Sequence, residues 1–195
     1  MKIIGITGGV GSGKSQVLSY MKEEFDAVVC QADHVAWELQ NPGHACYNEI
    51  VNIYGDRILN EDRTINRKHL GAIVFSDYEK LSQLNRIMHP AVKQAIIKRI
   101  ESELAHDTSY FVIEAALLLE DHYDKICDEI WYIYTNEDVR RKRLKESRGY
   151  DDEKIDAIIN SQLSEESFYK QCHVVIDNSG DFQDTCNQIK KAMKQ

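Results

Sequence analysis

The chain has 195 residues, 43% of them hydrophobic and 29% charged, a balance typical of a globular protein with one well-packed domain. Its formal net charge of −8 opposes non-specific binding to nucleic acid, unless basic residues cluster locally. Only two prolines occur, which argues against a disordered proline-rich linker.

The cysteines and the first residues bear on the compartment. Five cysteines occur, an odd number, and no two of them form a C-x-x-C pair. They are Cys30, Cys46, Cys127, Cys172 and Cys186. A disulfide framework and a zinc site are poorly supported, so we expect free thiols in a reducing cytoplasm. The opening MKIIGITGG is too short and glycine-rich for a signal peptide, and no apolar run approaches the ~20 residues of a membrane helix.

The chain opens with a predicted strand, a glycine-rich loop and a helix. The apolar run KIIGIT (2–7) predicts a buried strand. After the loop, KSQVLSYMKEEF (14–25) has apolar residues at helical spacing. AVVC (27–30) predicts a second strand, which ends just before Asp33.

Residues 34–105 have a different character. Five stretches there have apolar residues three and four apart: HVAWELQ, ACYNEIVNIYG, RKHLGAIVF, YEKLSQLNRIM and AVKQAIIKRIESEL. The segments NPGH and NEDRT supply breaks. The pattern predicts a block of amphipathic helices set between strands.

The last part of the chain alternates between strands and helices. YFVIEAALLL (110–119), EIWYIY (129–134) and HVVID (173–177) predict strands. Residues 137–166 are charged and rich in helix formers, and DFQDTCNQIKKAM (181–193) predicts a closing helix. This alternation predicts an α/β fold with a parallel sheet covered on both faces.

The loop after the first strand fits the phosphate-binding motif G-x-x-x-x-G-K-[ST] through Gly8, Gly13, Lys14 and Ser15. Glycines let backbone N–H groups approach a phosphate, and the following helix points its positive dipole end at the same anion. Lys14 can reach the β- and γ-phosphates, and the Ser15 hydroxyl can bind Mg²⁺. The loop therefore predicts a nucleoside triphosphate.

The dinucleotide fingerprint G-x-G-x-x-G is a rival use of such a loop. With Gly9 and Gly11 as its first glycines, the third would fall at position 14, which is Lys14. NAD is therefore disfavoured.

Carboxylates follow two of the predicted strands. Asp33 can accept a hydroxyl proton or help to hold Mg²⁺, but it can equally cap the next helix. Glu114 and Glu120 flank AALLL, where a carboxylate can bind Mg²⁺ through water; a solvated loop acid is the preferred interpretation of Glu120.

Basic residues occur in two places. In EDVRRKRLKESRGYDDEK we expect most charges to form a solvated, salt-bridged helix face and predict a functional role for Arg143 and Arg148. In the helical block, Arg67 can bind a substrate phosphate bidentately. His89 precedes Pro90 and is expected in an extended conformation at a helix boundary, where a structural role competes with a functional one.

These residues together resemble the bacterial dephospho-coenzyme A kinase family over essentially the whole chain. The motifs that carry the resemblance are GITGGVGSGKS, the AD with Asp33, INRKHLGAIVF, LNRIMHP, LLLE, RKRL, SQ and VVIDNSG. Many NTPases share the glycine loop alone, whereas this combination, order and spacing is specific to the family.

The resemblance implies a P-loop NTPase-type three-layer α/β fold with a five-stranded parallel sheet. It implies a core of residues 1–33, 106–136 and 171–195, a helical acceptor-binding insertion at 34–105 and a helical lid at 137–170. The implied reaction transfers the ATP γ-phosphate to the ribose 3′-hydroxyl of dephospho-coenzyme A, with Mg²⁺, as the last step of coenzyme A synthesis.

The resemblance also implies the site residues. Those expected to bind ATP are Gly11, Ser12, Gly13, Lys14, Ser15 and Gln16, with Ser15 also on Mg²⁺. Asp33 is the expected base, assisted by Lys14 and the lid residue Arg143, and Arg67 and His89 belong to the acceptor side. We expect no nucleic-acid or membrane partner, and a monomer or small homo-oligomer.

The sequence departs from the family pattern in several places. Gln16 replaces the usual Thr, and Gln31 replaces the first Asp of a DAD motif, which places more weight on Asp33. Ser147 stands near the expected second lid arginine, with Arg148 beside it. Two rival functions stay open on the residues alone: another small-molecule kinase of this fold, and an NTP-dependent switch, for which no clear base-reading motif is visible.

Overall fold

The computed structural model describes residues 1–194, which divide into two compact units. The first unit comprises Met1–Val29 and the chain from His106 onward, and the second comprises Cys30–Ala105. The first is built on a sheet, and the second is helical apart from the end of one strand.

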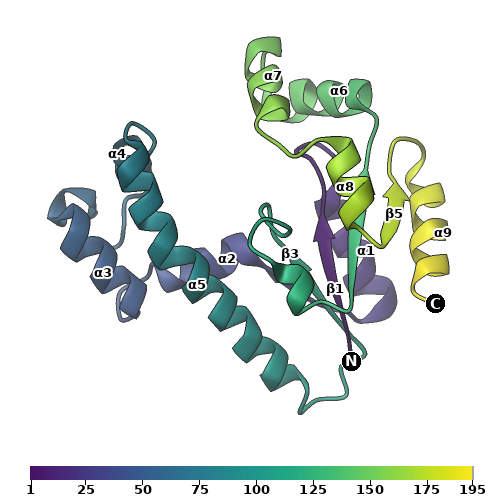
Figure 1. Ribbon diagram of the computed structural model, residues 1–195, viewed down its shortest axis with the longest axis horizontal. Helices are drawn as coiled ribbons and strands as arrows, with labels where there is room; N and C mark the ends of the chain where they lie inside the picture. The colour runs from purple at the N-terminus through teal and green to yellow at the C-terminus, as the bar shows by residue number, and fades with distance from the viewer. Residues whose placement is uncertain (195) are drawn as a thin grey trace. The chain divides into compact units, whose positions relative to one another are not determined.

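The sheet has five strands in the order β2-β3-β1-β4-β5 (Figure 1). The strands are β1 Lys2–Thr7, β2 Val28–Gln31, β3 Tyr110–Glu114, β4 Glu129–Tyr134 and β5 Val174–Asp177. β1 pairs in parallel with β3 and with β4, and β4 pairs in parallel with β5. The predicted α/β fold with a five-stranded parallel sheet is confirmed. Because β1, β3, β4 and β5 run in one direction, their carboxyl ends share one edge, where ligands bind in such folds.

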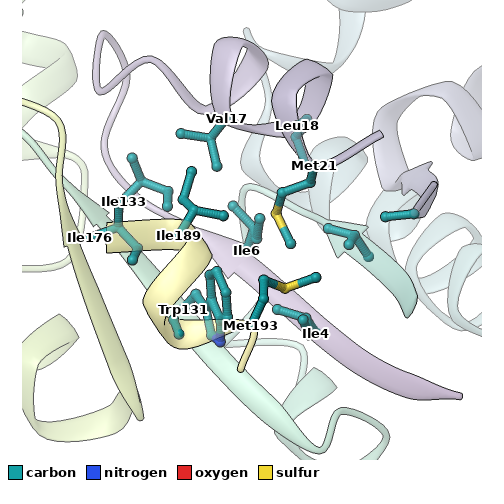
Figure 2. Packing of buried hydrophobic residues seen from close by; sticks show 13 residues of the cluster. Ile4, Ile6, Val17, Leu18, Met21, Trp131, Ile133, Ile176, Ile189 and Met193 are labelled. Carbon is teal, nitrogen blue, oxygen red and sulfur yellow. The ribbon is translucent and has the colours of Figure 1, made fainter. Parts of the chain in front are cut away.

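Two helices cover one face of this sheet and enclose the core of the first unit. They are α1, Lys14–Phe25, and α9, Phe182–Ala192. Figure 2 shows Val17 and Ile189 of these helices packed above Ile6 of the central strand, and all three side chains are fully buried. The apolar spacing predicted for 14–25 is thus the buried face of α1, which fixes the helix start directly after the glycine loop.

One long helix organises the second unit. Its helices are α2 Ala32–Leu39, α3 Ala45–Tyr54, α4 Arg67–Val74 and α5 Tyr78–Glu103, with a 3₁₀ turn at Asp56–Ile58. α5 packs against each of the other three α-helices. Its buried residues Met88, Val92, Ile96 and Ile100 recur every four positions, as one helix face requires.

The expected break at Pro90 is wrong. Pro90 lies inside α5, which runs through it as one helix of 26 residues (Figure 1). Proline lacks the N–H that would bond to the carbonyl of Arg86, but Met88 and Val92 bury the same face on both sides of it. Tertiary packing therefore overrides the local preference, and His89 is helical rather than extended.

Three strand predictions also change. β2 and β5 each begin one residue later than expected, at Val28 and Val174, and β3 stops at Glu114 instead of continuing to residue 119. Turns follow β3, and they bury Leu118 and Leu119. The apolar residues after Glu114 are therefore buried in turns and do not extend the strand. Glu114 is the last residue of β3.

The charged segment predicted as helical forms three short helices. They are α6 Glu137–Arg148, α7 Asp152–Asn160 and α8 Glu165–Gln171. Asn136, Asp151 and Ser164 cap their N-termini by accepting backbone N–H bonds, and Gly149 ends α6 in the left-handed conformation. No helix within residues 1–194 combines the length and apolar character needed to span a membrane.

Candidate active site

The glycine loop joins the central strand β1 to α1. Gly11 and Gly13 have φ angles of 84° and 83°, a conformation that favours glycine, and Gly13 is the N-cap of α1 with no side-chain cap. A Cβ atom on Gly13 would lie 2.3 Å from Asn178 Nδ2, so only glycine fits there. The N-terminal N–H groups of α1 therefore have no side-chain cap to compete with an anion.

Lys14 lies within the loop and close to the end of β3. Its ammonium group donates a 2.8 Å hydrogen bond to Gly8 O and lies 4.0 Å from Glu114 Oε1. Glu114 and Lys14 therefore share the carboxyl edge of the sheet, as the strand order requires. Ser15 and Gln16 are exposed in the first turn of α1, whereas Glu120 is exposed in the turns after β3.

A group of hydrogen bonds fixes the carbonyl of Ser12. This oxygen accepts from Thr135 Oγ1 at 3.0 Å and from Asn178 Nδ2 at 2.8 Å. Asn178, directly after β5, is only 1% exposed, and its Oδ1 accepts from the Thr185 hydroxyl. Because C=O and N–H point in opposite directions across a trans peptide, the N–H of Gly13 is held facing away from Asn178.

Arg143 on α6 joins the same group. Its Nη2 donates to Asn178 O at 2.9 Å, and its Nη1 lies 3.5 Å from Ser12 O. The structure thus brings this predicted residue to the loop. Arg148, the other arginine singled out, has its guanidinium 5.9 Å from the ring centre of Tyr150.

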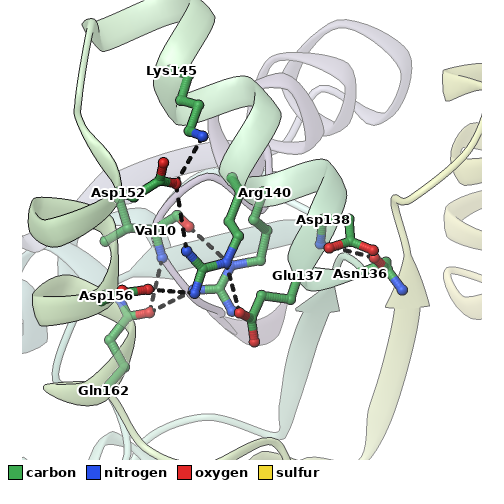
Figure 3. A network of polar contacts seen from close by, with 10 residues as sticks. Val10, Asn136, Glu137, Asp138, Arg140, Lys145, Asp152, Asp156 and Gln162 are labelled. Carbon is green, nitrogen blue, oxygen red and sulfur yellow. Dashed lines mark hydrogen bonds and ion pairs between the residues drawn. The ribbon is translucent and has the colours of Figure 1, made fainter.

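Sequence reasoning missed the second loop-binding arginine of α6. Arg140 is 7% exposed and donates from Nε to Val10 O at 3.0 Å and from Nη2 to Gln162 Oε1 at 2.7 Å (Figure 3). A signal was present in the sequence, because Arg140 lies four residues before Leu144 and thus shares its helix face. Those two residues are the buried ones of α6.

The other basic residues of this segment form the expected salt-bridged face. Arg141 pairs with Glu137 at 2.7 Å and with Asp156 at 2.5 Å. Lys145 pairs with Asp152 at 2.7 Å (Figure 3). Their charges are balanced within α6 and α7.

Asp33 is exposed in the first turn of α2, in the second unit. The N-cap of α2 is Gln31, so the alternative interpretation of Asp33 as the cap is wrong. A carboxylate in a first helical turn is favoured by the helix dipole but makes no capping bond there. The side chain is therefore available to a hydroxyl group.

Arg67 begins α4 and lies on an aromatic ring. Its guanidinium carbon is 4.6 Å from the ring centre of Trp37, which is 43% exposed. The ring of His34 lies 5.1 Å from that of Trp37. Arg67 and Trp37 border a polar cavity of about 280 Å³, which is lined by Trp37, Gln40, Asn41, Thr64, Ile65 and Arg67.

His89, on α5, borders a different cavity of the second unit. This cavity of about 390 Å³ is lined by Tyr78, Leu81, Ser82, Asn85, Arg86, His89 and Pro90. The two predicted acceptor residues Arg67 and His89 thus border separate hollows of the helical unit.

A comparison with protein families and known proteins now decides between the kinase classes. The family model for dephospho-CoA kinase matches residues 2–184. The chain belongs to the dephospho-CoA kinase family. It is 39% identical to the dephospho-CoA kinase of Carboxydothermus hydrogenoformans over 189 residues, which cover 97% of this chain and 91% of that protein.

Solved structures show the same fold. The structure of TT1252 from Thermus thermophilus matches with a TM-score of 0.84 at 24% identity, over 99% of this chain and 96% of that one. The dephospho-CoA kinase from Campylobacter jejuni matches with a TM-score of 0.74 at 22% identity, over 100% and 96% of the two chains.

Family membership confirms the predicted activity. Members of the dephospho-CoA kinase family catalyse the last, ATP-dependent step of coenzyme A biosynthesis, and this chain is a kinase that acts on dephospho-CoA. The rival predictions of a different acceptor and of a non-enzymatic switch are not supported.

Proposed function

We propose that the loop Gly11–Gln16 binds the ATP phosphates and that Lys14 follows the γ-phosphoryl group as it moves to the ribose 3′-hydroxyl of dephospho-CoA. The observation that carries this proposal is the loop geometry: positive φ angles at Gly11 and Gly13, an uncapped helix N-terminus and the Lys14 ammonium group held over the loop. Each of these features favours a polyphosphate anion.

Mg²⁺ fits the donors at this loop. It binds oxygen ligands, keeps several waters and uses few protein ligands when phosphates are present. The exposed Ser15 hydroxyl, at the first turn of α1, is the protein ligand that we propose. No group of His, Cys, Asp and Glu within residues 1–194 forms a metal cluster by itself, in keeping with an ion held chiefly by phosphates. When bound, Mg²⁺ neutralises phosphate charge.

Asp33 is the proposed general base. Its carboxylate, exposed one residue after the start of α2, accepts the proton of the attacking 3′-hydroxyl as the oxygen bonds to phosphorus. The leaving ADP takes the electron pair of the broken P–O bond, so the oxygen of the acceptor gains the phosphoryl group and loses its proton to Asp33.

Arg143 is the proposed lid cation. Its bonds to Asn178 O and its approach to Ser12 O place a guanidinium at the loop, where positive charge stabilises the transferred phosphoryl group. We propose the helices of residues 137–170 as the lid that carries it.

The second unit is the proposed acceptor-binding part. Arg67 offers the bidentate N–H donors that suit a phosphate of dephospho-CoA, and His89 borders a second hollow of the same unit.

We further propose that the enzyme works in the cytoplasm as a monomer or small homo-oligomer. We propose no nucleic-acid partner, because the net charge of −8 opposes binding to a polyanion.

A coupled ADP-release assay tests the acceptor. The rate of ADP release by purified protein with Mg²⁺ and ATP is measured in three reactions: with dephospho-CoA, with AMP and with no acceptor. ADP release that requires dephospho-CoA, and falls away when Mg²⁺ is chelated, is expected. Equal release with AMP, or release independent of any acceptor, would contradict the proposal.

A further inference from the structure

The peptide groups around Val10 are bonded on both sides by residues far along the chain. Gln162 Oε1 accepts the N–H of Val10 at 3.3 Å, and Arg140 Nε donates to the carbonyl of Val10 at 3.0 Å. Arg140 Nη2 also donates to Gln162 Oε1 at 2.7 Å, which closes a ring of three hydrogen bonds (Figure 3). Val10 lies inside the phosphate-binding motif, so this ring fastens α6 and the segment after α7 to the loop.

The loop glycines leave room for this contact. A Cβ atom on Gly9 would lie 2.4 Å from Arg140 Nη2, and one on Gly11 would lie 3.1 Å from Leu144 Cγ. At Gly9 a side chain would force the Arg140 guanidinium to move, and at Gly11 the contact would be tight. One side of the loop is therefore packed directly against α6, which makes α6 part of the surroundings that set the loop conformation.

The contact also sets the direction of a neighbouring N–H group. The carbonyl of Val10 points to Arg140, so the N–H of Gly11, in the same trans peptide, points the opposite way. Gly11 belongs to the residues proposed to bind ATP. Holding its N–H away from α6 keeps that donor available to the phosphates instead of letting the peptide rotate.

Arg140 brings an unbalanced charge to the loop. It is only 7% exposed, and in the part of the chain that the structure describes its guanidinium bonds to a carbonyl and an amide oxygen, with no ion pair to a carboxylate. The neighbouring Arg141, in contrast, pairs with Glu137 and Asp156. A buried cation without a counter-ion is costly and favours binding of an anion nearby.

We propose that Arg140, with Gln162, is a positioning residue that holds the Val10–Gly11 peptide in the phosphate-binding conformation of the loop and adds positive charge beside the nucleotide phosphates. This role rests on the proposed binding of ATP at the loop. It assigns the buried arginine of α6 to the nucleotide side of the reaction.

Equilibrium binding of ADP, measured by calorimetry on the full chain, tests the proposal. Arg140→Met removes the donors and the charge but keeps an apolar side chain for packing. Its Kd for ADP, and its KM for ATP, should rise about 10–100-fold, the usual effect of losing charged hydrogen bonds. The KM for dephospho-CoA should change less than about two-fold, because the acceptor does not bind this loop.

Arg141→Met is the matched control, since it deletes a guanidinium one residue away that bonds only to carboxylates. Its Kd for ADP should stay close to that of the unchanged chain. Gln162→Leu keeps Arg140 but opens the ring, and should weaken ADP binding in the same direction by a smaller factor. The double variant Arg140→Met with Gln162→Leu should bind ADP about as weakly as Arg140→Met alone, because the two residues act as one unit.

The proposal is overturned if Arg140→Met binds ADP as tightly as Arg141→Met, or if its two KM values rise by the same factor. Should Arg140→Met fail to fold, Gln162→Leu decides alone, since Gln162 is only half-buried. If Lys14→Ala binds ADP normally, it is the phosphate-loop assignment that fails. If Lys14→Ala binds ADP weakly while Arg140→Met binds it normally, the phosphate-loop assignment stands and only the role proposed for Arg140 is refuted.

Discussion

The ammonium group of Lys14 donates to the carbonyl oxygen of Gly8, the first glycine of the phosphate-binding motif, at 2.8 Å. The lysine thus bends back across the loop that precedes it. A carbonyl dipole holds an ammonium group less strongly than a phosphate does, because phosphate oxygens carry full negative charge. A triphosphate on the loop therefore competes well for the same donors, and the lysine charge is already in place when it binds.

Replacement of Lys14 by Ala should lower turnover by several orders of magnitude, because it removes the charge that stabilises the transferred phosphoryl group. The coupled ADP-release assay measures the turnover of Lys14→Ala beside that of the unchanged chain. Lys22→Ala, an exposed position in the last turn of the same helix, is the control and should retain full turnover. Near-normal turnover of Lys14→Ala would refute the assignment of the loop.

Asp33→Asn should lower kcat by about 10²–10⁴-fold if the carboxylate takes the hydroxyl proton. The KM for ATP should change little. Glu79→Gln is a matched control, since Glu79 is also an exposed carboxylate in a first helical turn, of α5. It loses the same favourable interaction with a helix dipole. An Asp33→Asn variant with the kcat of Glu79→Gln would show that Asp33 has only that structural role.

Local sequence rules predicted the elements that depend on local chemistry. The strand at 2–7 and the helix at 14–25 match β1 and α1 to the residue, because glycines mark the boundary and apolar spacing marks the buried faces. Pro90 shows where such rules fail. The local rule ends a helix before proline, but the buried face of α5 continues through it, and packing against three helices outweighs one missing hydrogen bond.

The contacts of the candidate site were less predictable. Arg140 and Arg141 are neighbours with the same side chain, yet one is buried on the loop and the other pairs with Glu137 and Asp156. The two side chains differ only in the direction in which they leave the helix axis, and Leu144, the single buried apolar residue of α6, was a weak guide to that direction. The stacking of Arg67 on Trp37 joins two helices of the second unit, which no spacing rule reveals.

Pro90→Ala should raise the free energy of unfolding by about 1–2 kcal/mol. Alanine restores an N–H donor for the carbonyl of Arg86, and the larger freedom of the unfolded chain offsets part of the gain. Pro90 is exposed, so no core packing is lost. Urea titration of Pro90→Ala beside Gln94→Ala, an exposed control on α5, measures the difference. A less stable Pro90→Ala would mean that the proline ring itself supports the helix.

Trp37→Leu should raise the KM for dephospho-CoA about 3–10-fold and leave the KM for ATP unchanged. Trp37 covers one face of the Arg67 guanidinium and so restricts its orientation, while the N–H edge stays open to an anion. Trp37→Phe keeps an aromatic face and should recover most of the loss. Arg67→Ala should have the larger effect on the same KM.

The tryptophans also supply an optical test of that site. Of the two in the chain, Trp131 is fully buried and Trp37 is 43% exposed. Dephospho-CoA added without ATP should therefore change the fluorescence of the unchanged chain but not that of Trp37→Phe. If Trp37→Leu keeps a normal KM for dephospho-CoA while Arg67→Ala does not, Arg67 needs no aromatic support.

Cys172 should resist thiol reagents in the folded protein. Burial raises the pKa of its thiol to about 12. The thiolate is the reactive form, and at pH 8 only about one molecule in 10⁴ carries it at Cys172, so the rate of modification should rise about tenfold per pH unit until the thiol ionises. Iodoacetamide labelling followed by mass spectrometry, at pH 7, 8 and 9, measures this rate at Cys172, and the same reaction in urea gives the unfolded reference.

The thiol of Cys172 ionises at lower pH in the unfolded chain than in the folded one, so unfolding releases a proton in alkaline solution. The contribution of this group to stability must therefore fall as the pH rises above about 9. Labelling of folded Cys172 at the rate found in urea would show that α8 and the strand beside it open freely around the thiol.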